Sequence, residues 1–458
     1  MTLEGTRRQK SEQLELALEA RGEALHGQRS GEAPTVANGN ERSGSDHRLM
    51  EAVVERANAI AALKRVRQNQ GSPGIDGMTV ENLPVYLATE WEAIRAQLLA
   101  GTYQPQPVRR QEIPKRGGGV RQLGIPTVLD RFIQQCLLQV LQPRFDPTFS
   151  EHSYGFRPGR RAHDAVWAAQ RFIQEGRHWV VDVDLEKFFD RVNHDVLMGR
   201  LAKRIADGRV LRLIRRYLEA GIMANGVVRE RYEGTPQGGP LSPLLANVLL
   251  DEVDKELEKR GHAFCRYADD LNGYVRSKRA GERLMKTLTR LFTGLRLRVN
   301  SEKSAVARAW ERKFLGFSFW VAPGRVIRRR VAPQTLKEMR DRVRQITRRS
   351  GGRSLKQIAA ELREYLTGWK AYFRLAETPR VLSDLDEWVR HRLRALQLKQ
   401  WKSGRTIYRE LRARGLSEIG AARVAANTRC WWHNAGLLIH VALPNRAIDA
   451  LGVPRLGR

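Results

Sequence analysis

Residues 266–275 read RYADDLNGYV and place two aspartates, Asp269 and Asp270, side by side between two runs that read as β-strands. This pattern predicts a hairpin that carries both carboxylates at its tip. Adjacent like charges repel each other, and the rest of the chain is basic, with 81 Lys and Arg against 50 Asp and Glu. A cation between the carboxylates would relieve that repulsion, so the pair is a candidate metal site.

A second acidic strand is expected upstream, in the segment WVVDVD at residues 179–184. Its alternation sets Val181 and Val183 on one side and Asp182 and Asp184 on the other. Taken alone, the segment is better explained by a solvated strand face or a cap for the next helix. If Asp184 lies beside the hairpin tip, three carboxylates share a small volume, and such oxygen ligands suit magnesium. Two ions about 4 Å apart would clamp an in-line displacement at phosphorus.

The composition of the whole chain indicates a nucleic-acid partner. With 458 residues, 41% of them hydrophobic, the chain can bury a sizeable core. A net charge of +31 favours a polyphosphate over an acidic protein or a membrane, because neutralised phosphates release counterions. The cysteines form no CxxC pair, which argues against a disulfide framework or a zinc site and suits a reducing cytoplasm. No stretch is apolar for long enough to span a membrane.

The two acidic segments belong to a longer series of motifs. In chain order the series is GIDG (74–77), IPKRGGGVRQLGIPT (113–127), SYGFRPGRRAHDAV (153–166), the acidic strand, GTPQGGPLSPLLANV (234–248), YADD (267–270), LRVNSEKS (297–304) and FLGF (314–317). This series resembles the reverse transcriptases encoded by bacterial group II introns. The segments LTGWKAYFR (366–374) and LDEWVRHRLR (385–394), and the ending ALPNRAIDALGVPRL, resemble the thumb and maturase region of the same family.

The resemblance implies a catalytic role for three carboxylates. Asp184, Asp269 and Asp270 match the family's ligands for two Mg²⁺ ions, whereas Asp182 is interpreted as a neighbouring strand residue. Phe189 decides in favour of Asp184, because an aromatic residue at that spacing matches the family position that packs under the incoming sugar and excludes a ribose 2′-hydroxyl. From local sequence alone, Phe189 is equally well explained as an ordinary core phenylalanine.

Four further residues match family positions that bind the incoming nucleotide. Lys115 and Arg121 flank a triple glycine in the fingers, where a basic hairpin can be a mere solvated edge but where a lysine and a guanidinium also suit a triphosphate. Gln237 lies among glycines that let the backbone approach a nascent base pair. Lys303 could protonate the leaving pyrophosphate or balance its charge.

Positions near the aspartates depart from the family pattern. Asn272 and Gly273 stand where many relatives are hydrophobic, and a glycine within a strand weakens it or marks a close backbone approach. Glu186 stands where relatives often carry lysine, which adds negative charge near the site. All three presumed metal ligands remain, so the resemblance still implies an active enzyme.

The C-terminal third interleaves Arg and Lys with Trp, a composition that pairs with phosphates and stacks on unpaired bases. An amphipathic bundle is the competing interpretation, and we expect both to hold, with Trp369, Tyr372 and Phe373 in its core. The resemblance implies that this region holds intron RNA. Some family members carry a zinc-bound HNH nuclease domain, but its cysteine pairs do not occur here, so cleavage of target DNA is not expected. The cations expected to be exposed and to bind RNA are Arg390, Arg392, Arg394 and Lys402.

The predicted fold is α+β, a right-hand polymerase with mixed fingers and palm, a helical thumb and a small helical C-terminal basic domain. Gly, Ser and Asn crowd the N-terminal segment, which predicts a mobile leader. The expected divisions are a mobile polar leader at 1–46, fingers and palm at 47–320, a thumb or maturase (X) domain at 321–400 and a basic nucleic-acid-binding region at 401–458.

These features predict an RNA-directed DNA polymerase, the nucleotidyltransferase of a mobile element, which also acts as a maturase in splicing and retromobility. Its expected partners are its group II intron RNA, an RNA template with a DNA primer, dNTPs and a DNA target, in the bacterial cytoplasm. Two alternatives stay open: a stand-alone or defence-associated reverse transcriptase without a splicing role, and a non-catalytic RNA-binding splicing protein. The intact carboxylates argue against the second of these.

Overall fold

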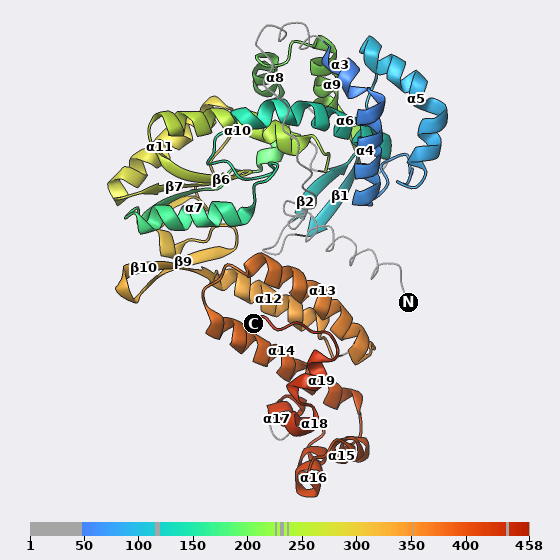
Figure 1. Cartoon of the computed structure of the whole chain (residues 1–458), viewed down its shortest axis with the longest axis vertical. Helices are drawn as coiled ribbons and strands as arrows, with labels where there is room; N and C mark the ends of the chain where they lie inside the picture. The colour runs from blue at the N-terminus through green and yellow to red at the C-terminus, as the bar shows by residue number, and fades with distance from the viewer. Residues whose placement is uncertain are drawn as a thin grey trace, which may run out of the picture. The chain divides into compact units, whose positions relative to one another are not determined.

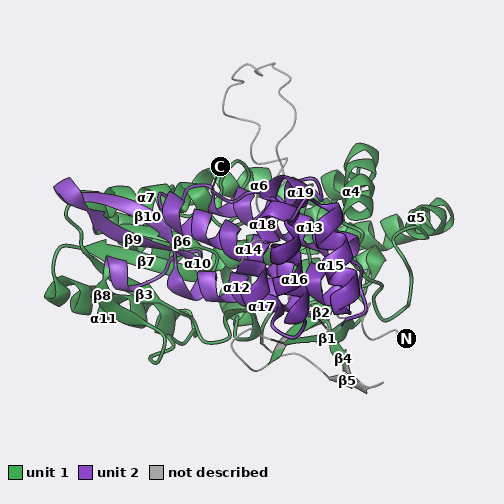
Figure 2. Ribbon diagram, turned by 90° about the horizontal axis from the view of Figure 1, so that it is seen from below, with its two compact units in different colours: residues 1–308 green, residues 309–458 purple. Residues whose placement is uncertain are grey.

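The computed structural model describes residues 48–114, 120–224, 227–229, 233–235, 238–349, 351–436 and 439–457. Its contacts divide the chain into two compact units, residues 1–308 and 309–458, which Figure 2 colours separately. The leader predicted at 1–46 lies outside the described residues. The domain divisions predicted after residues 320 and 400 stay predictions.

In its described part, the first unit combines helices with two four-stranded sheets (Figure 1). Its helices are α3 Leu49–Val53, α4 Arg56–Asn69, α5 Leu83–Ala100, α6 Val128–Phe145, α7 Ala162–Gln174, α8 His194–Ala202, α9 Gly208–Glu219, α10 Ser242–Lys259 and α11 Lys278–Gly294. Its strands are β1 Val108–Pro114, β2 Val120–Ile125, β3 Trp179–Val183, β4 Ile222–Ala224, β5 Val227–Arg229, β6 Ala263–Tyr267, β7 Asp270–Val275 and β8 Ala305–Arg308. Short 3-10 helices span Asp146–Thr148 and Phe188–Asp190.

The palm sheet has the order β6-β7-β3-β8, and each neighbouring pair is antiparallel. On one face, the ring of Tyr274 in β7 lies against Phe172 of α7, with centroids 5.8 Å apart. On the other face lies α11, and a Cβ on Gly273 would come within 2.8 Å of its Leu284 side chain. Gly273 therefore marks a close approach of the helix to the strand, as its departure from the family pattern suggests.

The second sheet has the order β2-β1-β4-β5, in which β1 pairs antiparallel with β2 and parallel with β4. The two strands predicted around the triple glycine are thus confirmed as β1 and β2, while residues 115–119 between them lie outside the described residues. Helix α6 begins directly after β2, where the side chain of Thr127 accepts a hydrogen bond from the Asp130 backbone as an N-cap.

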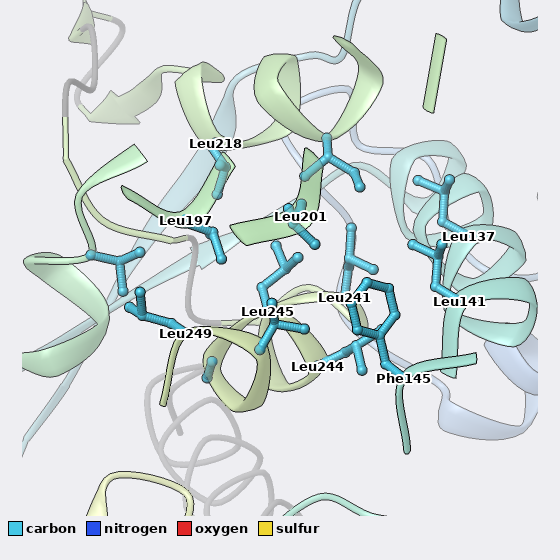
Figure 3. Close-up of a cluster of buried hydrophobic side chains, with 14 of the residues drawn as sticks. Leu137, Leu141, Phe145, Leu197, Leu201, Leu218, Leu241, Leu244, Leu245 and Leu249 are labelled. Carbon is cyan, nitrogen blue, oxygen red and sulfur yellow. The ribbon is translucent and has the colours of Figure 1, made fainter. Parts of the chain in front are cut away.

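Leucines from α6, α8, α9 and α10, with Leu241 just before α10, pack together in the first unit's core (Figure 3). Helix α10 is the most deeply embedded of them, and it buries Asn247, Asp251 and Asp254 along with its leucines. Buried polar side chains of this kind need hydrogen-bond partners, because burying them unpaired is costly. The leucines labelled in the core are Leu137, Leu141, Leu197, Leu201, Leu218, Leu241, Leu244, Leu245 and Leu249.

The second unit begins with a hairpin of β9 and β10 and continues as helices. Helix α13 starts with a capping box between Ser354 and Gln357. As predicted, Trp369 and Phe373 are buried in the core, and the partly buried Tyr372 donates its hydroxyl to the Leu315 carbonyl oxygen at 3.1 Å. Its elements are β9 Phe317–Ala322, β10 Val326–Val331, α12 Pro333–Ile346, α13 Leu355–Phe373, α14 Pro379–Gln400, α15 Gly404–Ala413, α16 Glu418–Ala426, α17 Trp431–Gly436, α18 Ile439–Ala442 and α19 Asn445–Asp449, with 3-10 helices at Ala309–Glu311 and Pro323–Arg325.

The N-terminal helices follow the sequence pattern closely. Residues 49–69 and 83–100 have apolar side chains at helical spacing in the sequence, and they form α3, α4 and α5. Gly101 ends α5 with φ of 68°, in the left-handed region where glycine is favoured. Within the described residues, none of the helices is both long and apolar enough to cross a membrane.

Candidate active site

The YADD motif forms the turn of the β6–β7 hairpin, as predicted. Tyr267 and Asp270 are the last paired residues of the two strands, so Ala268 and Asp269 make the connection. Ala268 has φ of 56°, in the left-handed region that side chains other than glycine rarely adopt. The surrounding structure must therefore stabilise a turn that local sequence does not favour.

The pairing of β3 with β7 brings the end of the acidic strand, β3, to the end of the sheet that carries the YADD turn. Strand β3 pairs with β7 so that Asp182 faces Asn272, and the same register continued by two residues sets Asp184 opposite Asp270. In the orientation that satisfies its hydrogen bonds, the Asn272 amide donates to Asp182 Oδ1 at 3.0 Å. The unusual Asn272 thus partners Asp182 inside the sheet, while Asp184 stands at the end that carries the YADD turn.

The segment NSEKS, residues 300–304, fastens the end of the acidic strand. The Asp184 amide donates to Ser304 Oγ at 3.0 Å, and the Asn300 amide donates to the Asp184 carbonyl oxygen at 2.9 Å. This anchorage places Lys303 Nζ 3.8 Å from Asp184 Oδ1. Both side chains are largely exposed, so the pair adds little stability, but it places the Lys303 charge beside Asp184.

The donor atoms at this end of the sheet suit a hard divalent cation. Carboxylates supply oxygen ligands only, which Mg²⁺ prefers. Among the described residues, however, no three His, Cys, Asp or Glu side chains gather closely enough to hold a metal ion. The assignment of Asp184, Asp269 and Asp270 as ligands therefore depends on the backbone register and stays a proposal.

Phe189 follows the acidic strand and lies against the start of the segment GTPQGGP (234–240), which we call the glycine-rich loop. It is half-buried, and its ring packs edge-on against Phe188 with centroids 5.0 Å apart. Its carbonyl oxygen accepts a hydrogen bond from the Thr235 amide at 2.7 Å. Gly234 has φ of 92°, and a Cβ there would lie 2.9 Å from the Phe189 carbonyl oxygen, so the close approach requires glycine. Gly234 and Thr235, three and two residues before Gln237, are thereby held against Phe189.

Three predicted nucleotide-binding residues are only partly visible. Lys115 and Gln237 lie outside the described residues, and for Arg121 the structure describes the backbone in β2 but not the side chain. The far end of the glycine-rich loop reaches the same strand, because a Cβ on Gly238 would lie 2.9 Å from the Gly124 carbonyl oxygen. The described parts of this loop thus touch both the Phe189 segment and β2, which carry Phe189 and Arg121, two of the predicted nucleotide-binding residues.

The extra negative charge of Glu186 is balanced within the chain. Arg191 Nη2 lies 3.1 Å from Glu186 Oε2. The departure from the family pattern at Glu186 therefore comes with a local counter-charge.

The structure overturns one expectation in the C-terminal region. Arg390 is 2% exposed, and its guanidinium pairs with Asp386 one helical turn earlier and with Asp449 Oδ1 at 2.7 Å. The prediction that Arg390 is exposed is wrong, because this face of α14 is covered by α19. Arg390 neutralises two carboxylates of the fold.

The other three predicted RNA-binding cations are more accessible. Arg392 is half-buried and donates to Thr347 Oγ1 at 2.7 Å, and Arg394 is half-buried and donates to the Leu443 carbonyl oxygen at 2.9 Å. Burial lowers the pKa of Arg392 and of Arg394, with neighbouring arginines acting in the same direction. Lys402, which follows α14, is exposed.

Cations and tryptophans alternate on one part of the second unit. The Trp388 ring lies 5.7 and 5.3 Å from two guanidinium groups, and the Trp431 ring lies 5.5 Å from a guanidinium and 5.0 Å from an ammonium. Of these cations, Arg349, Arg392 and Lys399 form no ion pair with any described residue. We call the set without a carboxylate partner the cation–aromatic ladder, and its members are Arg349, Trp388, Arg392, Lys399 and Trp431; Arg344, which is paired with Asp341, is not included.

Most of this ladder was not identified from the sequence. Arg266, which the structure buries and pairs with Asp254, was not identified either. The positions of Trp388, Arg392 and Lys399, four and seven residues apart, place them on one helix face and could have revealed the ladder. Arg266 follows a run of buried residues in β6, where a buried charge requires a partner. Its partners could not be read from the sequence, because they come from distant segments.

Two family descriptions match the chain. "Reverse transcriptase (RNA-dependent DNA polymerase)" matches residues 113–319, and "Group II intron, maturase-specific domain" matches residues 336–415. The first range contains the acidic strand, the glycine-rich loop, the YADD turn and NSEKS. The second contains all of the cation–aromatic ladder except Trp431.

Known proteins align with this chain over different lengths. Protein YkfC of Escherichia coli (strain K12) is 34% identical over 275 residues, covering 51% of this chain and 72% of YkfC. The group II intron-encoded protein LtrA of Lactococcus lactis subsp. cremoris is 43% identical over 156 residues, covering 34% of this chain and 26% of LtrA. The putative COX1/OXI3 intron 1 protein of Saccharomyces cerevisiae is 27% identical over 319 residues, covering 57% of this chain and 38% of the intron protein. The chain thus spans well under half the length of both intron proteins.

The palm sheet with its acidic turn, together with the matched domain, defines the class as RNA-directed DNA polymerases. More particularly, since a maturase-specific region lies in the same chain, the protein belongs to the group II intron-encoded reverse transcriptases and maturases. The resemblance drawn from the motifs and the α+β polymerase fold that it implies are confirmed. The absence of an HNH domain stays a prediction.

Proposed function

We propose that the protein copies RNA into DNA with Mg²⁺ held by Asp184, Asp269 and Asp270, and that it binds its group II intron RNA to assist splicing and mobility. The strand pairing in the palm sheet supports the proposed DNA synthesis, because it brings the acidic strand and the YADD turn to one end of the sheet. Use of a divalent metal is general for reverse transcriptase domains, and the choice of two Mg²⁺ ions is part of the proposal.

Bound Mg²⁺ would neutralise and polarise the reacting phosphate. The chain's own residues bind and orient the nucleotide. Lys115 and Arg121 contact the triphosphate, and Gln237 hydrogen-bonds beside the nascent base pair. Phe189 fills the space that a ribose 2′-hydroxyl would need. Lys303, which lies beside Asp184, balances the charge of the departing pyrophosphate.

The RNA-binding surface in this proposal is the cation–aromatic ladder with Arg394 and Lys402. Its cations can neutralise phosphates and its tryptophans can stack on unpaired bases. The net charge of +31 favours a nucleic acid as the partner. Arg390 is left out of the contact set because its charge is already neutralised.

The remaining partners in the proposal are an RNA template with a DNA primer, dNTPs and a DNA target, in the cytoplasm of a bacterium. The maturase-specific match favours an intron partner over a stand-alone or defence-associated reverse transcriptase. Reading the DNA on both sides of the gene for a group II intron fold distinguishes the two directly.

The catalytic proposal is tested with the double substitution Asp269→Ala and Asp270→Ala. Primer extension on an RNA template with Mg²⁺ should be abolished, because two oxygen ligands are lost. RNA binding should be retained, since it depends on the basic surfaces. Asp182→Asn is the matched control, because Asp182 lies in the same sheet but pairs with Asn272, and it should still extend primers. Full-length extension by the double variant would refute the metal assignment.

The same variants separate polymerisation from splicing. The double aspartate variant should still support splicing of the flanking intron at low Mg²⁺, because holding a folded ribozyme does not require the polymerase metals. If it lost splicing in proportion to primer extension, the proposed division between palm and ladder would be wrong.

A further inference from the structure

Arg266 precedes the YADD motif directly and is 1% exposed. Its guanidinium donates from Nε to Asp254 Oδ1 at 2.8 Å, from Nη1 to Asn247 Oδ1 at 2.9 Å and from Nη2 to Ser153 Oγ at 2.8 Å. A further bond runs from Nη1 to the Ala268 carbonyl oxygen at 2.9 Å. With a second bond to Asp254 Oδ2, all five N–H groups of the guanidinium have an acceptor.

The bond to Ala268 distinguishes this network from a plain buried ion pair. Asp254 alone would neutralise the charge of Arg266. The Ala268 carbonyl, in contrast, belongs to the YADD turn between β6 and β7. Ala268 is the residue with the unfavourable φ of 56°, so the guanidinium restrains the turn at its strained position. A fully satisfied buried network of this kind favours one geometry over others.

The segment 153–155 holds the turn from another side. The Tyr154 amide donates to the Arg266 carbonyl oxygen at 2.8 Å, and Asn247 Nδ2 donates to the Gly155 carbonyl oxygen at 2.9 Å. A Cβ on Gly155 would lie 2.3 Å from the Ala268 nitrogen, so glycine alone lets this segment lie against the turn. Asn247 thus connects Arg266 to the segment that presses on the turn.

The network reaches the turn without touching the proposed reacting groups. In the antiparallel register, Arg266 pairs with Leu271, so its side chain lies on the face of the sheet that Leu271 shares with Gly273, the face that α11 covers. Asp270 and Asn272 alternate with Leu271 and lie on the opposite face. Arg266 therefore acts on the aspartates through the backbone of the turn.

We propose that Arg266, Asn247 and Gly155 are positioning residues that hold the Ala268 turn so that the adjacent aspartates are aligned to bind metal. This inference rests on the proposed function, in which those aspartates are metal ligands. The competing explanation is that the network only stabilises the fold. The two explanations differ in whether metal affinity changes at equal stability.

The first test is Arg266→Lys. A lysine can still pair with Asp254, but a single ammonium cannot also reach Asn247, Ser153 and the Ala268 carbonyl. In the metal-free protein, hydrogen exchange of the amides of residues 268–270 should become faster while the rest of the sheet stays protected. Binding of Mn²⁺, followed by electron paramagnetic resonance, should weaken roughly tenfold or more, with a matching rise in the Mg²⁺ needed for half-maximal primer extension. Affinity for the primer–template should not change.

The second test is Gly155→Ala, which changes no charge. The added methyl group must displace the Ala268 backbone, so the same weakening of Mn²⁺ binding is expected. Gly199→Ala is the matched control, since at that helical position a Cβ would meet no heavy atom within 4 Å beyond its chain neighbours and the backbone of its own helix. It should leave both exchange and metal binding unchanged.

Stability is controlled by two further variants. Arg209→Lys disturbs an ion-pair network with Asp207 and Glu51 elsewhere in the first unit and should lower the melting temperature without affecting metal binding. The pair Arg266→Met and Asp254→Leu replaces the buried charges by apolar groups and should regain stability without regaining metal affinity.

Wild-type exchange and Mn²⁺ binding in Arg266→Lys, or restored metal affinity in the Met/Leu variant, would overturn the proposal. An equal loss of metal affinity in Arg209→Lys would also overturn it, because that result indicates a general effect of stability. The underlying function fails separately, through primer extension by the Asp269→Ala and Asp270→Ala variant. If that variant is inactive and Arg266→Lys behaves as wild type, only the positioning role is refuted.

Discussion

The two units use buried and exposed arginine in different ways. In the first unit, Arg266 is enclosed and neutralised by Asp254. In the second, Arg349 and Arg392 lie over tryptophan rings and form no ion pair with any described residue. In a chain with a net charge of +31, the partner of each cation therefore indicates its use. Carboxylate-paired arginines build the fold, and ring-stacked arginines without a carboxylate stay available to phosphates.

Arg390 shows that the distinction follows the partner and not the unit. It lies in the second unit, two residues from Arg392 of the ladder, yet it is buried between Asp386 and Asp449. Its charge is satisfied within the fold in the same way as that of Arg266. A charge-removal experiment that includes Arg390 would therefore mix a loss of stability with a loss of RNA contacts.

The largest expected effect comes from breaking the buried pair. Asp254→Ala leaves the Arg266 charge buried without a counter-charge, which should lower the free energy of unfolding of the first unit by about 3–5 kcal/mol. Arg349→Gln is the comparison from the ladder and should change stability by less than about 0.5 kcal/mol. Urea unfolding of both variants measures the difference. Similar losses in the two variants would break the distinction between structural and available arginines.

How far the sequence predicts the molecule depends on how far apart the interacting residues are. The acidic hairpin follows from local alternation and forms as expected, and the helices near the N-terminus agree with the helical spacing of their apolar residues. The pairing of Asp182 with Asn272 depends on a register between strands some ninety residues apart, which local patterns do not specify.

The error at Arg390 has the same origin. Its position beside Asp386 on α14 resembles an ordinary exposed helical ion pair, and the sequence of the helix contains nothing against that interpretation. Burial comes from α19, whose Asp449 lies 59 residues further along the chain. Contacts made by distant segments decide which polar side chains are enclosed, and a single sequence does not show them.

An intermediate effect is expected from removing ladder charges. Arg349→Gln with Lys399→Gln should weaken intron RNA binding and lower the slope of log affinity against log salt by about 1 per lost phosphate contact, because fewer counterions are released. Binding measured over a KCl series gives both quantities. Primer extension on an unrelated template should change less.

Arg414→Gln is the sharpest control for that experiment. Arg414 lies 5.1 Å from the Trp401 ring centroid, as a ladder cation would, but it is also paired with Glu410. If the carboxylate decides availability, this variant should keep the wild-type salt slope. A loss equal to that of the ladder variant would show that stacking on a ring, and not the absence of a carboxylate, marks an RNA contact.

The smallest expected effect concerns His391, a ladder neighbour whose charge is suppressed by burial. Its ring lies 4.0 Å from the Trp432 ring, and its Nε2 lies 2.9 Å from the Trp432 carbonyl oxygen. Burial lowers the pKa of His391, the Trp432 carbonyl opposes this shift, and the charge of Arg394 adds to it.

The lowered pKa makes stability depend on pH. The unfolded chain takes up the proton more readily, with a pKa of about 6.5. The stability that the neutral His391 contributes is therefore complete above that pH and declines as the pH falls toward the pKa of the folded state. The melting temperature of the second unit should therefore fall slightly more between pH 7.5 and 5.5 in the wild type than in His391→Gln. An identical fall in both proteins would mean that the protons taken up in this pH range go to other groups and that burial does not keep His391 neutral.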